Sequence, residues 1–257
     1  MSEVIATITH LYIYPVKSMA GVALQAAHVG LDGILGDRIF TFIRGDQAAT
    51  NSFPWLTARE VSRLLHYRPV FPTLPTPSQP IPPIQIRTPD GLSHAPESPE
   101  LYSDLANQYG HSVFLLKSSR GIFDCQHISL FNLRSVSALS TESGADLDHR
   151  QFRANIYIEP ASGKAFDEEM WTDCLFQIGD QVLTGVTQRD TRCMMINLNL
   201  ETLQQDPRVL KTVVKSHQRQ AGLYANVIRP GIIRVGDTIR RLPQPGWTRF
   251  ATESASE

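Results

Sequence analysis

The residue in this sequence best suited to bind a metal is a cysteine, and an arginine comes directly before it. Cys193 comes after Thr191 and Arg192 and precedes an apolar run from Met194 to Leu200. A neighbouring positive charge favours the thiolate form of a cysteine, and thiolate is the form that ligates soft metals. Taken alone, the segment fits a half-buried structural cysteine equally well.

The other two cysteines, Cys125 and Cys174, add no metal or disulfide pattern. The three cysteines are widely spaced and form no Cys-x-x-Cys pair, which excludes zinc ribbons and thioredoxin-type redox centres. They are too few for an all-cysteine iron–sulfur cluster, and their odd number argues against a disulfide framework. Cys174 alternates with Phe176 and Ile178 and is expected to point into the core.

Cationic and amide side chains recur at the predicted ends of strands. Lys17 and Ser18 follow the first strand, Arg38 begins another, and Arg153 and Asn155 stand at the start of a third. Each segment alone is typical of a solvated charge or a turn. Together they are typical of groups that bind phosphate and other anions, because charge-assisted hydrogen bonds are strong. Only a closed pair of barrels would bring residues so far apart in sequence into one site.

Motifs of the common nucleotide and hydrolase sites are missing from the sequence. It contains no Gly-x-Gly-x-x-Gly, Walker A, His-Glu-x-x-His or Gly-x-Ser-x-Gly segment. Dinucleotide-binding folds, P-loop NTPases, zincins and α/β-hydrolases therefore lack their usual sequence support. The eight histidines show no metal-ligand spacing. His127 is predicted to open a helix, where a capping or surface role is favoured over chemistry.

Several short motifs, spread over nearly the whole chain, resemble one known family. The chain is similar to MOSC-domain proteins that carry the N-terminal MOSC β-barrel domain, such as the mitochondrial amidoxime reducing component and its bacterial relatives. The resemblance runs from Ile8 to Leu242. The motifs that carry it are Tyr-Pro-Val-Lys-Ser at residues 14–18, Gly-Asp-Arg at 36–38, Leu-Thr-Ala-Arg-Glu at 56–60, Phe-Arg-Ala-Asn at 152–155, Arg-Cys at 192–193 and Pro-Gly-Ile-Ile-Arg-Val-Gly-Asp at 230–237.

The resemblance implies a molybdenum pyranopterin cofactor, the molybdenum cofactor, in a cleft between two domains. In that family a cysteine thiolate ligates the molybdenum, and Cys193 holds the corresponding position with Thr191 and Arg192 beside it. The other cofactor-binding residues that the resemblance implies are Lys17, Ser18 and Arg38 at the phosphate end, Arg153 and Asn155 from the second domain, and Gln126 and His127 where relatives have a small hydroxyl residue.

The same resemblance implies a molybdenum-dependent oxidoreductase that reduces N-oxygenated, in particular N-hydroxylated, small molecules by oxygen-atom transfer to molybdenum. The alternative is a carrier of molybdenum cofactor or sulfur without redox turnover, because related domains are also fused to pyridoxal-phosphate cysteine desulfurases. No cysteine follows Cys193, so electrons are expected from a separate protein of the ferredoxin, flavodoxin or reductase type. Residues 197–202 depart from the Asp-Pro and Thr-Gly pair of many relatives, which bears on the substrate side more than on the metal.

The elements that must position these residues are mostly short strands. Alternation from Ile8 to Tyr14 and the apolar run 39–43 predict two strands, and recurrent Asp-Gly and Gly-Asp pairs are typical of barrels or sandwiches. Thr57 and Glu60 form a capping box that predicts a helix ending at Pro69. Further helices are predicted at 101–109 with a glycine stop, at 130–139 and from Asp206-Pro207 onward. Further strands are predicted at 112–117, 155–159, 175–178, 182–186, 223–228 and 232–235.

The expected fold class is mainly β with several helices (α+β), arranged as two β-barrel-like domains, and the last strands could close a barrel. Ten of the 17 prolines lie between Pro69 and Pro99, which predicts loops around an edge strand at 84–88 and then a domain linker. We therefore expect an N-terminal barrel domain at 1–98, a MOSC domain at 99–242 and a frayed tail at 243–257.

Composition excludes several other classes of protein. The 257 residues are 42% hydrophobic and 19% charged, with a net charge of −1, so the chain is neither disordered nor collagen-like and lacks the basic surface typical of nucleic-acid binders. No apolar run approaches the roughly 20 residues that span a bilayer, and the N-terminus lacks a signal-peptide pattern. A cytoplasmic protein with no nucleic-acid or membrane partner is expected.

Overall fold

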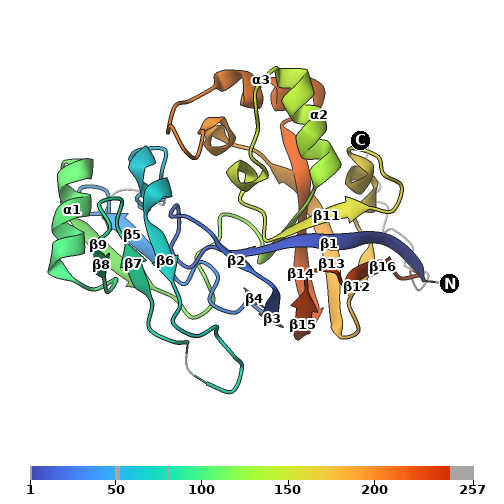
Figure 1. Cartoon of the computed structure of the whole chain (residues 1–257), viewed down its shortest axis with the longest axis horizontal. Helices are drawn as coiled ribbons and strands as arrows, with labels where there is room; N and C mark the ends of the chain where they lie inside the picture. The colour runs from blue at the N-terminus through green and yellow to red at the C-terminus, as the bar shows by residue number, and fades with distance from the viewer. Residues whose placement is uncertain (1, 50–52, 80, 244–257) are drawn as a thin grey trace, which may run out of the picture.

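Seven strands of the largest sheet close into a barrel in the computed structural model, which describes residues 2–49, 53–79 and 81–243 (Figure 1). The strand order is β11 (Ile156–Pro160), β10 (Ile128–Asn132), β14 (Gln220–Arg229), β13 (Val182–Thr191), β12 (Leu175–Ile178), β16 (Thr238–Arg241) and β1 (Glu3–Ile13). A further pairing of β1 with β11 completes the ring, and β2 (Val22–Leu24) extends the far end of β1.

The first strand closes the barrel because it is long enough to pair with two neighbours. β1 has register shifts between Val4 and Ala6 against β16 and between Ile8 and His10 against β11. Such bulges bend a strand and increase its twist, which closure requires. The barrel core is aliphatic, and Ile8, Ile158 and Ile239 are all at most 1% exposed. The N-terminal strand thus belongs to the same barrel as the C-terminal strands.

The rest of the N-terminal region consists of small sheets around a second core. Two sheets surround this core, β5 (Phe40–Arg44) with β9 (Val113–Lys117) and β6 (Arg68–Val70) with β7 (Gln85–Arg87) and β8 (Ser93–His94), whereas β15 (Gly231–Arg234) with β3 (Ala26–Gly30) and β4 (Gly33–Ile34) packs against the barrel core. The second core includes Leu56, Leu64, Ile86, Leu101 and Leu105. In Figure 1 this region lies to the left of the barrel. The domain boundary at 98/99 stays a prediction.

Three α-helices complete the described structure, and their ends follow their capping residues. In α1 (Pro99–Tyr109) the Ser98 side chain accepts a hydrogen bond from the Leu101 amide, and Gly110 ends the helix in the left-handed conformation. α2 (Leu133–Ser143) and α3 (Pro207–Ser216) pack on the outside of the barrel through a third apolar cluster. Among the described helices, none has the length and apolar character needed to cross a membrane.

The sequence predictions for α1, α3 and the fold class are confirmed, whereas three local predictions are wrong. The Glu60 carboxylate accepts hydrogen bonds from the amide and hydroxyl of Thr57, but the Glu60 amide donates to the Thr57 carbonyl, and the segment is a single turn followed by the short 3₁₀ helix η1 (Ser62–His66). Leu130 lies in β10 and His127 precedes that strand, because all five residues of β10 are buried and its apolar pattern looks the same as that of a helix. β7 lies between β6 and β8 and is therefore central rather than an edge strand. The predicted tail from residue 244 onward lies outside the described residues.

Candidate functional site

Cys193 lies just past the end of β13, at the first residue of a tight turn. It is half-buried and precedes the 3₁₀ helix η4 (Met194–Asn197), whose Ile196 amide donates to the Cys193 carbonyl at 3.3 Å. Its side chain does not cap this helix, and within the described residues the thiol makes no hydrogen bond. The thiol is therefore free and partly accessible, as a metal ligand must be.

Arg192 is a buried cation held by a buried carboxylate. Its Nη1 lies 2.8 Å from Asp190 Oδ2, and its guanidinium also donates to the carbonyls of Ala221 (2.6 Å) and Phe152 (2.8 Å). Burial raises the pKa of Asp190 to about 6, although Arg192 and a hydrogen bond from Tyr224 oppose that rise. Arg192 Nη2 is buried and has no hydrogen-bond partner among the described residues. This arginine fixes the strand end from which Cys193 projects.

Asp37 is the centre of a second group of buried polar contacts. Its carboxylate, 2% exposed, accepts hydrogen bonds from the Tyr14 amide (2.6 Å), from Asn155 Nδ2 (2.9 Å) and from Arg38. Asn155 also donates to the Tyr12 carbonyl and accepts from the amide and hydroxyl of Ser129. The side chain of Asn155 is thus fully used inside the protein, where it links β1 to β10.

Two of the predicted site residues, Arg38 and Arg153, stack on one tyrosine ring. Their guanidinium carbons lie 4.8 Å and 4.3 Å from the centroid of Tyr14, respectively. Arg38 donates to the Arg153 carbonyl at 3.0 Å, and Arg153 donates to the Met19 carbonyl at 2.8 Å. Burial lowers the pKa of Arg153 to about 10, with Arg38 adding to that effect. Arg153 remains a cation near neutral pH and makes no ion pair with a described residue.

Lys17 brings a third cation to the same region from the N-terminal part of the chain. Its Nζ lies 2.6 Å from Asp124 Oδ1 and 3.1 Å from the Ile122 carbonyl, and the side chain is 6% exposed. Burial lowers the pKa of Lys17, while the Asp124 carboxylate counteracts that shift. Asp124 itself is 63% exposed, so this carboxylate can move away and leave Lys17 to another anion.

Backbone conformation also distinguishes three predicted site residues. Ser18, Arg38 and Arg153 have φ angles of 66°, 51° and 54°. Side-chain-bearing residues rarely adopt this left-handed region, and those that do gather at functional sites because the surrounding structure must hold them there. Five other described non-glycine residues share this conformation, and Arg153 adopts it as the C-cap of the 3₁₀ helix η2 (His149–Phe152).

The remaining predicted residues lie around this region with fewer contacts. His127 is half-buried, and the centroid of its ring is 5.3 Å from that of Phe123. Its Nδ1 is buried and finds no hydrogen-bond partner in the part of the chain that the structure describes. Gln126 is half-buried in the same segment, and Thr191 is exposed at the last position of β13. Their predicted contacts to a cofactor stay predictions.

Mutual electrostatic influence joins the cations of both halves of the molecule into one group. The pKa of Lys17 responds to Arg38 and Arg153, and that of Asp190 responds to Arg192, Arg38 and Asp124. We call this group the site network. Its members are the cations Lys17, Arg38, Arg153 and Arg192 and the carboxylates Asp37, Asp124 and Asp190.

Two family models match the chain at its two ends. The MOSC N-terminal beta barrel domain matches residues 5–73, and the MOSC domain matches residues 117–240. The chain belongs to the MOSC family. MOSC domains are associated with binding of the molybdenum cofactor in general.

One solved structure supports the fold of this MOSC protein. The chain is similar to the YuaD protein of Bacillus subtilis, with a TM-score of 0.52 and 14% identity over 95% of this chain and 100% of that one. It is also similar to YiiM of Geobacillus stearothermophilus, with a TM-score of 0.36 and 16% identity over 46% of this chain and 54% of that one. At such identities YuaD shows the shared fold alone. No curated protein matches the chain.

Sequence reasoning missed the partners that hold the MOSC site residues in place. Asp37, Asp190 and Tyr14 were not singled out, although Asp37 and Tyr14 stand inside the motifs that were quoted. The available signal was their position beside Arg38, Arg192 and Lys17, because a buried arginine or lysine needs a counter-charge.

The residues present fit an anionic cofactor that carries a metal. The site network offers cations from both halves, and Arg153 among them has no carboxylate of its own. Gly222, at φ +86°, lies where a Cβ would come within 2.9 Å of the Leu130 carbonyl and 3.0 Å of Arg192 Nη2, so the absence of a side chain lets β14 pack closely against this arginine. Among the described residues, no group of three or more His, Cys, Asp or Glu is placed to hold a metal ion. Cys193 as a single protein ligand is consistent with a metal whose other ligands belong to the cofactor.

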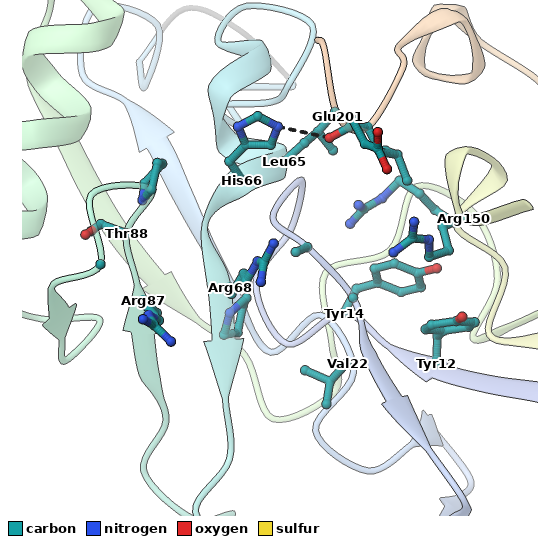
Figure 2. A pocket seen from close by; sticks show the side chains of 17 residues that line it. Tyr12, Tyr14, Val22, Leu65, His66, Arg68, Arg87, Thr88, Arg150 and Glu201 are labelled. Atoms are coloured by element: carbon teal, nitrogen blue, oxygen red, sulfur yellow. Dashed lines mark hydrogen bonds between the residues drawn. The ribbon is translucent and has the colours of Figure 1, made fainter. Parts of the chain in front are cut away.

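A separate cleft of about 890 Å³ opens beside this network, lined by arginines (Figure 2). Of the ten predicted site residues, all of them described, only Arg153 lines it. We call it the arginine cleft. Its charged lining residues are Arg68, Arg87, Arg150, Arg153, His66 and Glu201, and Tyr12, Tyr14, Val22 and Leu65 contribute rings and aliphatic groups.

Proposed function

We propose that this MOSC protein holds a molybdenum cofactor with Cys193 as the metal ligand, and that it reduces N-hydroxylated compounds with electrons from a separate donor protein. The observation that carries the proposal is the position of a free, half-buried thiol directly after Arg192, at the border of a cation network built from both halves of a MOSC chain. When bound, the cofactor supplies a redox-active metal centre that exchanges an oxygen atom with an N–O group.

Each side chain of the network has a task that the geometry supports. Lys17 and Arg153 offer positive charge to anionic groups of a ligand, because the partner of Lys17 is exposed and Arg153 makes no ion pair with a described residue. Asp37 and Tyr14 fix the direction of Arg38, and Asp190 fixes that of Arg192. Preorganised charges of this kind bind an anion without reorganising when it arrives.

The carrier role remains the second candidate, and one observation favours it. The Cys193 thiol makes no hydrogen bond within the described residues and is partly exposed, so it could accept a sulfur atom from the persulfide of a partner enzyme. Both roles use the same thiol, and turnover separates them. The cytoplasmic location and the class of electron donor also stay predictions.

Expression in a host that makes the molybdenum cofactor tests the proposal. We expect purified wild-type protein to retain molybdenum and pterin and to reduce an N-hydroxylated amidine with a chemical electron donor. Cys193→Ala should lose the metal and at least about 100-fold in turnover, because the thiolate is a direct ligand. Cys174→Ala, which removes another half-buried thiol packed on the barrel core, is the matched control and should keep both.

Three outcomes decide between the alternatives. A folded wild type that retains neither molybdenum nor pterin overturns cofactor binding. Retention of molybdenum and pterin without substrate turnover, together with a persulfide trapped on Cys193, supports the carrier role. Unchanged turnover in Cys193→Ala contradicts the role of the thiol in either case.

A further inference from the structure

Arg68 and Arg87 lie opposite each other on one wall of the arginine cleft. Arg68 on β6 and Arg87 on β7 are directly opposite in the antiparallel register, and both are exposed on the same face of the sheet. Within the part of the chain that the structure describes, neither guanidinium makes a hydrogen bond or an ion pair. Like charges directly opposite on neighbouring strands destabilise a sheet, so this pair is costly unless an anion lies between or beside the two side chains.

More positive charge lies on the opposite wall of the cleft. Arg150 and Arg153 come from the segment around the 3₁₀ helix η2 (His149–Phe152), and Figure 2 shows Arg150 across the cleft from Arg68 and Arg87. Asp148 binds Arg150 and offsets its charge. Glu201 adds a second carboxylate, whose charge also acts on Arg150, so four arginines against two carboxylates leave two positive charges in and beside the cleft. Two uncompensated charges match a dianion.

The cleft also has an apolar side that suits an organic body. The rings of Tyr12 and Tyr14 lie 6.4 Å apart at 29° to one another, and Val22 and Leu65 line the same space. A hydrogen bond of 2.9 Å between His66 and the Leu200 carbonyl holds the segment that carries Glu201 against the N-terminal region. The volume of about 890 Å³ lies in the range of small-molecule sites.

From these features we infer that the arginine cleft is a binding site for a small organic dianion, a phosphate monoester or a dicarboxylate with a flat or aliphatic body. Arg68 and Arg87 bind the anionic group from one wall, with Arg153 completing its contacts from the other. Guanidinium groups suit this task because their paired N–H donors match phosphate and carboxylate oxygens. The inference shares Arg153 with the proposed cofactor site but does not depend on reductase activity, because binding can be measured whether or not the chain turns over a substrate.

Isothermal titration of the purified full chain with phenyl phosphate tests the site. At about pH 7.5 the probe is mostly a dianion, since such phosphates have a second pKa near 6. We expect saturable binding of one molecule per chain. Phenyl sulfate, which has the same ring and a single charge, should bind at least about tenfold more weakly at equal ionic strength. Phthalate distinguishes a dicarboxylate ligand from a phosphate monoester. If phthalate binds as tightly as phenyl phosphate, the site takes dicarboxylates, and if it binds more weakly, the site takes phosphate monoesters.

Arginine variants locate the binding. Arg68→Gln and Arg87→Gln should each weaken phenyl phosphate binding about tenfold or more, with far-ultraviolet circular dichroism unchanged. Arg120→Gln removes an exposed arginine that does not line the cleft and should change affinity less than about twofold. The inference is overturned if no saturable binding occurs up to about 10 mM, if Arg120→Gln weakens binding as much as the cleft variants, or if loading the molybdenum cofactor abolishes binding. The last result would show that the cleft holds the cofactor itself.

Discussion

The site network and the arginine cleft both gather arginines, but they treat the charges in opposite ways. In the site network Arg38 and Arg192 bind buried carboxylates and Lys17 binds an exposed one. In the arginine cleft Arg68 and Arg87 oppose each other with no acidic partner among the described residues. The comparison teaches that positive charge serves two purposes here. Paired cations hold the shape of a site during folding, whereas unpaired ones lower stability and gain a partner when a ligand binds.

The largest expected effect on stability comes from removing the Asp37 carboxylate, which lies at the centre of a group of buried hydrogen bonds. Asp37→Asn replaces a buried carboxylate that accepts hydrogen bonds from Tyr14, Asn155 and Arg38. The new amide group would face donors and leave Arg38 without a counter-charge. Removing one partner of a buried ion pair typically costs about 3–5 kcal/mol, and urea unfolding at neutral pH should show a loss of that size.

Asp180→Asn is the control for this loss. Asp180 is exposed in a turn of the barrel, and its side chain makes no ion pair among the described residues. Its removal should leave the midpoint of unfolding within experimental scatter. Equal stabilities of the wild type and the Asp37→Asn variant would show that the buried pairing does not hold the site together.

A second test follows the pH dependence of the other buried carboxylate. The pKa of Asp190 rises from 3.8 to about 6 on folding, chiefly because of burial, so the folded protein holds this proton more tightly than the unfolded chain. The contribution of Asp190 to stability is therefore greatest below about pH 4 and decreases as the pH rises through 6. A shift of this size corresponds to a decrease of at most about 3 kcal/mol.

The measurement is the difference in free energy of unfolding between wild type and Asp190→Asn at a series of pH values from about 4 to 7. The wild type should lose stability relative to the variant across that window. The same series on Asp180→Asn should give a flat difference. A difference that is flat for Asp190→Asn as well would mean that Asp190 is ionised throughout and that Arg192 fully compensates its burial.

Local signals in the sequence were enough for much of the fold. The alternation in β1, the Ser98 and Asp206 caps and the Gly110 stop are each encoded within a few residues. The strand identity of Leu130 was not predictable in this way, because a fully buried segment has the same apolar pattern in a helix and in a strand. The 3₁₀ form of η1, in which only Leu64 and Leu65 are buried, has no such local signal either.

The residues of the candidate site also divide into those that local sequence motifs predict and those that only the fold reveals. Lys17, Arg38, Arg153 and Cys193 stand in motifs that can be recognised without a structure. The carboxylates Asp37 and Asp190 look like ordinary surface charges until the fold buries them. The arginine cleft depends on the pairing of β6 with β7, in which Arg68 lies opposite Arg87, 19 positions later in the sequence. Only the folded structure sets this register, so the sequence of neither strand predicts that Arg68 and Arg87 lie opposite each other.

The smallest expected effect is a gain in stability, and it comes from replacing one of the two opposed arginines. Arg87→Glu places an acid directly opposite Arg68 on the same face of the sheet, and an opposite-charge cross-strand pair is worth about 0.2–1 kcal/mol. Thermal unfolding in low salt should therefore show a more stable variant, and the gain should shrink in about 1 M salt, where charges are screened within about 3 Å. Arg120→Glu makes the same change in charge away from the cleft and controls for net charge. If both variants gain equally, the effect comes from exchanging an exposed positive charge for a negative one at any position rather than from the cross-strand pair. If Arg87→Glu loses stability in low salt, the wild-type pair is not repulsive and the contrast between the two regions fails.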